Sequence, residues 1–225
     1  MALIYPRPMP LVGASSISFE PSVVDYMSPE TGGRIGAVAA GFPLWRMRIA
    51  LANMDVEHSD IWRAFIASMR GSRRQFLATD LTRPRPRFHM DGVPFGQSST
   101  SSWSQTIDSN GDAALTLNNL SPGAVLLTGD YIGFKWDTSG AAAGTYGRRA
   151  LVRTVSASVV GVNQSVTVIV EPPVLSLVPS TALAHVDQPA CLMRIITGST
   201  QLGEQVVDGY TASGGTIEAV QDLLP

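Results

Sequence analysis

The feature that most constrains this fold is a change of hydrophobic period between residues 43 and 76. From Leu44 to Leu51, apolar side chains alternate with polar ones, which is the period of a strand with one buried face. Apolar residues then recur every three or four positions up to Met69, which predicts an amphipathic helix of about four turns. A second strand, Gln75–Ala78, follows this helix. The residues that we expect in the core of this unit are Trp45, Met47, Ile49, Ile61, Trp62, Phe65 and Met69.

Both ends of the predicted helix carry residues that suit a helix terminus. Asp55 and Ser59 are alternative N-cap residues, because a short polar side chain there accepts a hydrogen bond from a free backbone N–H group. Gly71 stands where a left-handed residue ends many helices. The arginines around that end favour the negative pole of the helix dipole. The sequence therefore predicts a helix that begins near residue 55 and ends near residue 71.

Composition limits the class of protein. A chain of 225 residues suits one large or two small domains, and 15% charged residues favours a surface partly used against other subunits. The net charge of −2 gives no general attraction to nucleic acid or acidic membranes. No apolar run reaches the length of a membrane span, and the proline-bearing N-terminus lacks the core of a secretion signal. We therefore expect a chain assembled in a cytoplasm, without membrane insertion.

Residues 1–14 look like an extended arm, because Pro6, Pro8 and Pro10 prevent helix formation. Arms of this kind often lie on a neighbouring subunit. We divide the rest into a strand-helix-strand portion, residues 15–110, and a β-sandwich or barrel portion, residues 111–225; one continuous domain is the alternative. Within the first portion, the sequence predicts a strand at Ile17–Glu20 and loops at 28–41 and 82–102.

From Trp103 onward, the pattern is that of an all-β structure. Short apolar stretches alternate with turn signals such as Asn110-Gly111, the 128–130 TGD turn and the 161–164 GVNQ turn. The fold class that follows is mainly β with one principal α-helix, in which the helix packs on a sheet of a sandwich or barrel. The predicted strands are Ser104–Ile107, Ala113–Leu117, Ala124–Trp136, Arg148–Val160, Ser165–Val170, Ala182–Val186, Leu192–Thr197 and Thr216–Leu223.

No pattern in the sequence indicates catalysis, a cofactor or a metal. Residues 108–112 begin like a calcium loop, but Ala113 and Asn119 occupy the positions that need Gly and Glu, which favours a hairpin turn. The three histidines, His58, His89 and His185, lack ligand spacing. Cys191, the single cysteine, cannot form an intramolecular disulfide, and its apolar neighbours indicate a buried thiol. We expect no enzyme activity, no cofactor and no metal.

Two arginine-rich segments are candidate interfaces. Guanidinium groups suit phosphate, but few aromatic residues accompany them, so a subunit interface or intramolecular ion pairs are the favoured interpretations. The acidic partners for such pairs are Asp80, Asp91 and Glu57. The candidate interface residues are Arg70, Arg73, Arg74, Arg83, Arg85 and Arg87.

Three segments resemble a known family. The segment LWRMRIALANMDVEHSDIWRAFIASMRGSRRQFLATD is similar to a strand-helix-strand segment of tail-tip proteins of long-tailed bacteriophages. The segments LSPGAVLLTGDYIGF and RRALVRTVSASVVGVNQSVTVIVEPPV resemble the β module of the same proteins. Together the similarity covers residues 43–80 and 115–197, in the same order along the chain. The family that the sequence most resembles is the distal tail protein.

This resemblance implies a structural virion protein at the tail tip of a siphovirus. Such a protein forms a ring, a homohexamer in this family, that joins the tail tube to the baseplate hub. The implied partners are further copies of the chain, the tail tube protein, and the tape measure and hub proteins. DNA would pass through the lumen without sequence-specific binding. The resemblance does not cover the large C-terminal carbohydrate-binding extension that some family members carry, so we do not expect sugar binding from it.

Three alternatives remain open at this stage. A carbohydrate-binding β-sandwich would need an exposed aromatic groove, and its candidates are Trp103, Trp136, Tyr131 and Tyr146. An enzyme would need a carboxylate pair such as Asp130 and Asp137 across a cleft. Another minor tail or tube-end protein would share the same patterns as a distal tail protein.

Overall fold

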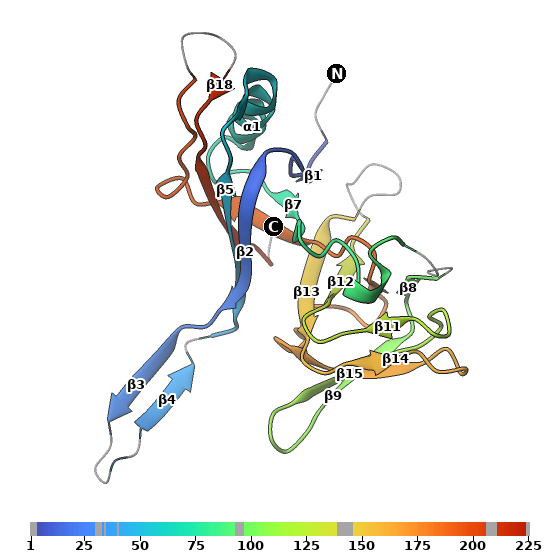
Figure 1. Cartoon of the computed structure of the whole chain (residues 1–225). Helices are drawn as coiled ribbons and strands as arrows, with labels where there is room; N and C mark the ends of the chain where they lie inside the picture. Colours follow the sequence, from blue (N-terminus) through green and yellow to red (C-terminus); the bar gives the residue numbers. More distant parts are fainter. Residues whose placement is uncertain are drawn as a thin grey trace.

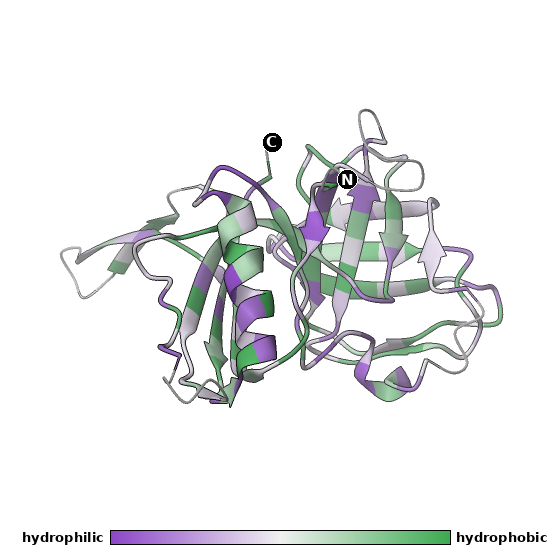
Figure 2. Ribbon diagram, turned by 90° about the horizontal axis from the view of Figure 1, so that it is seen from above, coloured by the Kyte–Doolittle hydropathy of each residue, from purple (hydrophilic) through white to green (hydrophobic). Residues whose placement is uncertain are grey.

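The computed structural model describes residues 4–29, 33, 35–39, 41–92, 97–138, 146–205 and 211–223. These residues form two lobes that lie side by side, each built on its own β-sheet (Figures 1 and 2). The described residues contain one α-helix, which belongs to the first lobe. The fold is therefore mainly β with a single α-helix, as the sequence predicts.

The first lobe is a six-stranded sheet in the order β1-β7-β17-β19-β5-β2. Its middle strands β17 and β19 come from the C-terminal part of the chain, so the predicted boundary between residues 110 and 111 does not coincide with the boundary between the sheets. The predicted strand Leu44–Leu51 is confirmed as β5. The bounds are β1 (Arg7–Pro8), β2 (Ala14–Ser22), β5 (Leu44–Leu51), β7 (Phe76–Ala78), β17 (Cys191–Ile195) and β19 (Thr216–Gln221).

Helix α1 (Val56–Met69) packs on one face of this sheet, and Asp55 is its N-cap, with the side chain accepting a hydrogen bond from the His58 N–H group. The helix ends one residue earlier than predicted, because Arg70 takes the left-handed conformation ahead of Gly71. The placement of Ile61 in the core is wrong, since its side chain is 43% exposed. The other six predicted core residues, Trp45, Met47, Ile49, Trp62, Phe65 and Met69, are buried.

The second lobe is a seven-stranded sheet in the order β8-β16-β12-β13-β15-β10-β9, accompanied by the short ribbon β11-β14. The predicted strand Ala124–Trp136 is interrupted because residues 127–130 form a turn, in which the Asp130 N–H group donates to the Leu127 carbonyl. The bounds are β8 (Ser99–Thr100), β9 (Trp103–Ile107), β10 (Ala113–Leu117), β11 (Val125–Leu126), β12 (Tyr131–Trp136), β13 (Arg148–Thr154), β14 (Ser158–Val159), β15 (Val166–Glu171) and β16 (Leu183–His185).

A β-hairpin, β3 (Asp25–Pro29) and β4 (Ile35–Ala39), projects from the first lobe, away from the second (Figures 1 and 2). The prediction of a loop at 28–41 is therefore wrong. Glycine and proline in this segment indicate a loop, but β3 follows β2 and β4 precedes β5, so the hairpin prolongs an antiparallel pair of the sheet. A second small pair joins β6 (Met54–Asp55) to β18 (Thr211–Ala212), and a 3₁₀ turn, η1 (Arg87–His89), lies within the predicted 82–102 loop.

The N-terminal arm packs on its own chain. Strand β1 pairs in parallel with β7, and the Tyr5 hydroxyl donates to the Ser68 carbonyl at 3.0 Å. Met9 is only 3% exposed and belongs to the core of the first lobe. The described part of this arm therefore packs on its own chain, with Met9 buried and Ile4 and Leu11 59% and 68% exposed. Contact of the arm with a neighbouring subunit stays a prediction.

Two substitutions on opposite faces of α1 test which of its faces packs on the sheet. Phe65→Ala removes a ring that is 1% exposed and should lower the free energy of unfolding by about 3–5 kcal/mol. Ile61→Ala, on the exposed side of the same helix, should change it by less than about 1 kcal/mol. Urea unfolding of both variants measures the difference, and equal losses would contradict the helix orientation described here.

Candidate functional site

The β3-β4 hairpin carries the most exposed apolar strands in the described part of the chain. Tyr26, Met27, Ile35 and Val38 are each between 69% and 70% exposed, and Val24, just before β3, is 56% exposed. Tyr26 pairs with Val38 across the hairpin, whereas Met27 is the next residue along the strand and points to the opposite face. Apolar side chains are therefore exposed on both faces.

An isolated two-stranded hairpin is at best marginally stable in water, and an exposed apolar patch commonly marks a protein interface. Five residues on each strand extend it by roughly 17 Å beyond the sheet. No described residue outside the hairpin pairs with its strands. The arrangement favours a contact with another polypeptide chain.

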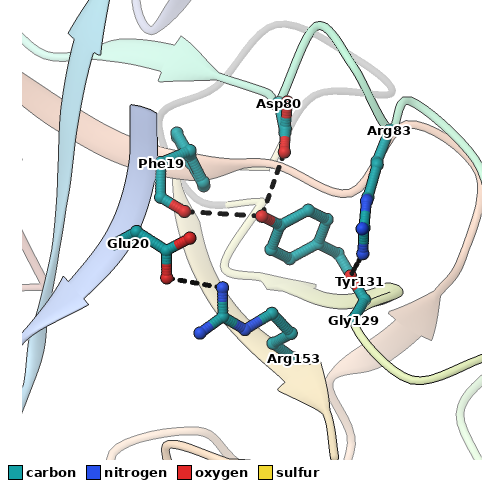
Figure 3. A network of polar contacts seen from close by, with 7 residues as sticks. All are labelled: Phe19, Glu20, Asp80, Arg83, Gly129, Tyr131 and Arg153. Carbon is teal, nitrogen blue, oxygen red and sulfur yellow. Dashed lines mark hydrogen bonds and ion pairs between the residues drawn. The ribbon is translucent and has the colours of Figure 1, made fainter. Parts of the chain in front are cut away.

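The two lobes are held together by a joint around Tyr131 (Figure 3). The Tyr131 hydroxyl, which is buried, donates to the Asp80 carboxylate at 3.0 Å and lies 3.4 Å from the Phe19 carbonyl oxygen. At the edge of the joint, Arg153 of β13 pairs with Glu20 of β2 at 2.5 Å. Burial and the Asp80 charge raise the pKa of Tyr131, so its proton is retained.

Trp45 provides the apolar centre of the same joint. Its ring is fully buried, packs against both Phe19 and Tyr131, and donates its indole N–H group to the Leu151 carbonyl of the second lobe at 2.8 Å. Burial of aromatic rings together with satisfied hydrogen bonds fixes the orientation of one sheet against the other. The lobes therefore form one rigid unit, from which the hairpin projects.

Only some of the six arginines predicted to form an interface keep exposed side chains. Arg74 packs over the Tyr5 ring and donates to the Ser68 carbonyl, and Arg83 donates to the Gly129 carbonyl. Arg85 pairs with Asp187 at 2.7 Å, a partner that the sequence did not suggest. Among the described residues, neither Asp80 nor Glu57 forms an ion pair, so these two expected pairs are wrong. The side chains that remain exposed are Arg70, Arg73 and Arg87.

The candidate carboxylate pair, Asp130 and Asp137, lies at opposite ends of β12. Asp130 is fully buried and accepts hydrogen bonds from the Leu127 and Arg87 N–H groups. Burial raises its pKa, and these two hydrogen bonds oppose that rise. Asp137 pairs with Arg148 at the other end of β12, roughly 20 Å along the strand. The two carboxylates therefore do not flank a common cleft.

The aromatic residues of the carbohydrate hypothesis do not form an exposed groove. Trp103 packs edge-on against Phe134 and donates to the Ala182 carbonyl, and Trp136 packs against the same core. Tyr131 lies in the joint. Tyr146 is half-buried beside Lys135 and Arg149. Two of these rings therefore pack on the core of the second lobe, and the other two lie elsewhere.

Several smaller features have a structural explanation. The Asp108 carboxylate accepts hydrogen bonds from the Asn110 and Asp112 N–H groups, which confirms the predicted hairpin turn between β9 and β10. Cys191 is fully buried, as predicted, and burial raises the pKa of its thiol. Within the described ranges, no three His, Cys, Asp or Glu side chains gather closely enough to bind a metal ion. No helix in those ranges is long and apolar enough to cross a membrane.

Neither a protein-family model nor a curated protein matches this sequence.

One buried polar residue lies outside all of these interactions. His185 of β16 is 4% exposed, and neither ring nitrogen has a partner at good hydrogen-bond geometry, although the backbone groups of Leu183 and Gly133 act on the ring. Burial lowers the pKa of His185 to about 3, assisted by the charges of Lys135 and Arg149 and opposed by backbone groups of Leu183 and Gly133. The imidazole is therefore neutral in the folded protein near pH 7.

The first prediction from this geometry concerns Tyr131. Tyr131→Phe leaves the buried Asp80 carboxylate without one donor and should lower the free energy of unfolding by about 1–3 kcal/mol. Tyr26→Phe, which removes a hydroxyl from a ring that is 70% exposed, is the matched control and should have little effect. Thermal unfolding of both variants tests this, and an unchanged midpoint for Tyr131→Phe would contradict the role of the joint.

A second prediction concerns acid stability. The unfolded chain binds a proton at His185 below its ordinary pKa of 6.5, whereas the folded chain does so only near a pKa of 3. Stability should therefore fall as the pH drops from 6.5 toward 3, by about 3 kcal/mol between pH 7 and pH 4. His185→Gln should lose that part of the pH dependence in urea unfolding. Identical pH profiles for the two proteins would contradict the prediction.

Proposed function

We propose that this chain is a structural protein of a bacteriophage tail tip and that it assembles with copies of itself into a closed ring. The proposal has two supports. The sequence segments 43–80 and 115–197 resemble the distal tail protein family in content and order. The fold, mainly β with one helix on a sheet, has the composition of elements that this resemblance implies.

The observation that carries the proposal is the exposed hairpin. Its four most exposed apolar side chains stand on a projection that the rest of the described chain does not cover. A ring of identical subunits uses two different surfaces on each copy, one of which reaches the next subunit. A projecting hairpin is suited to that task, because it carries apolar area away from its own core and into a neighbour.

In this function the chain acts mechanically. The ring joins the tail tube to the baseplate hub, contacts the tape measure protein during assembly, and leaves a lumen for DNA. A hexamer is the stoichiometry that the resemblance implies. The net charge of −2 suits a channel lining through which DNA passes, since a strongly basic surface would bind phosphate and slow its passage.

The experiment that tests this proposal is the mass of the protein in solution. We expect light scattering after size exclusion to give a closed oligomer whose share rises with concentration, and negative-stain images of it to show a ring with a central hole. The triple variant Tyr26→Ser, Ile35→Ser and Val38→Ser should shift the protein to a monomer that still unfolds cooperatively, because the hairpin lies outside both cores, with a melting midpoint that no longer depends on concentration.

Val162→Ser is the control for this experiment. Val162 is 97% exposed in the turn that leads into β15, so the substitution removes apolar area at another projecting turn. It should leave assembly unchanged. A wild-type protein that stays monomeric at every concentration, or a triple variant that assembles like the wild type, would contradict the proposal.

A further inference from the structure

A cavity of about 450 Å³ lies between the two lobes, next to the joint. One wall comes from the N-terminal arm and β7 and is apolar, with Met9, Leu11 and Leu77. The opposite wall comes from β12, β13 and β16 of the second sheet. Its size is within the range of small-molecule sites, which often lie between two structural units.

The second wall is basic. Lys135 of β12 and Arg149 of β13 are directly opposite each other in the antiparallel register, so two positive charges are cross-strand neighbours on the sheet. Such a pair destabilises a sheet unless a group of opposite charge lies nearby. The ring of Tyr146 lies 5.1 Å from the Lys135 ammonium and 5.6 Å from the Arg149 guanidinium group, but a ring only partly offsets two charges.

The carboxylates that line the cavity are already engaged. Asp187 pairs with Arg85, and Asp80 accepts hydrogen bonds from Tyr131 and Thr82. Among the described residues, neither Lys135 nor Arg149 forms an ion pair. The Arg149 Nε group is buried and has no hydrogen-bond partner. Two cations thus face the cavity, and the carboxylate whose charge acts on Lys135, Asp187, is already paired with Arg85.

His185 lies beside them in the same wall. Gly133, its register partner on β12, leaves room for the imidazole, because a Cβ atom at Gly133 would lie 2.6 Å from His185 Cε1. His185 is 4% exposed, and neither ring nitrogen has a partner at good hydrogen-bond geometry; the backbone groups of Leu183 and Gly133 are the polar groups that act on the ring. A buried polar group that is left unpaired costs about 1–3 kcal/mol, and a ligand is one way to satisfy it.

We propose that this cavity binds a small organic anion with an apolar body, of the class of a medium-chain carboxylate. The anionic group would lie against Lys135 and Arg149, where it neutralises the opposed charges and accepts a charge-assisted hydrogen bond. The apolar body would lie along Met9, Leu11 and Leu77 on the opposite wall. This site goes beyond the proposed assembly function, since none of its residues belongs to the hairpin.

The test uses octanoate as the probe, with two matched comparison compounds. Octanol has the same chain length without the charge, and acetate has the charge without the chain. Isothermal titration of the full chain should give saturable octanoate binding, with affinities for octanol and acetate weaker by about tenfold or more. If octanoate gives no saturable binding, or if octanol binds equally well, the proposal is overturned.

Substitutions of the two cations test whether octanoate binds in this cavity. Arg149→Gln and Lys135→Gln should each weaken octanoate binding by about tenfold, which corresponds to the loss of one charge-assisted contact. Each variant should fold with an unchanged or higher melting midpoint, because it removes one member of an opposed like-charge pair. Arg46→Gln makes the same charge change on the exposed face of β5 and is the control.

Octanoate binding that is equal in Arg149→Gln, Lys135→Gln and Arg46→Gln would overturn the assignment to this cavity. The measurement is also independent of assembly. It is made on the monomeric hairpin variant as well as on the wild type, so a failure to form rings and a failure to bind the carboxylate give separate results.

Discussion

Strand β12 is covered on both faces, and the rest of the structure depends on this constraint. Ile132 and Phe134 lie in the core of the second lobe, whereas Tyr131 belongs to the core of the first lobe and Lys135 lines the cavity between the lobes. The apolar end of that second face, around Tyr131, is closed by Phe19 and Trp45. At its polar end, around Lys135, the N-terminal arm supplies only apolar side chains, and the carboxylates that line the cavity, Asp80 and Asp187, are engaged by other partners. One strand therefore produces both the rigid joint and the basic cavity.

Much of the local structure follows from the sequence. The alternation in Leu44–Leu51 predicts β5 because one of its faces is polar, and Asp55 predicts the start of α1 because its carboxylate can reach the His58 N–H group. The helical pattern is less informative about orientation. Ile61 and Trp62 are adjacent apolar residues, and only the position of the sheet decides that Trp62 is buried and Ile61 exposed.

The features that sequence patterns miss are those that depend on distant partners. Segment 28–41 contains the glycine and proline of a loop, yet β4 forms because it continues the pairing between β2 and β5. Lys135 and Arg149 are separated along the chain by residues without a regular pattern, so their opposition appears only with the sheet register. Arg85 likewise finds Asp187 through the fold rather than through any nearby acidic residue. The run Tyr131-Ile-Gly-Phe-Lys135 carries one signal: four uncharged residues precede Lys135, with Tyr131 on the face opposite to Ile132 and Phe134, which is typical of a strand with partial cover on its second face.

The joint is buried, whereas the hairpin is exposed, and this difference matters for the proposed assembly. The joint satisfies its buried polar groups and fixes the two lobes, whereas the hairpin exposes apolar side chains on both faces. The hairpin is nevertheless not a detached loop, because β4 leads directly into β5, and β5 lies between β19 and β2 in the sheet. A contact made by the hairpin would therefore act on strands whose Trp45 and Phe19 side chains also form the joint. An interface at the projection would be coupled to the two lobes through the strands of the sheet, which is the mechanical property that the proposed ring would need.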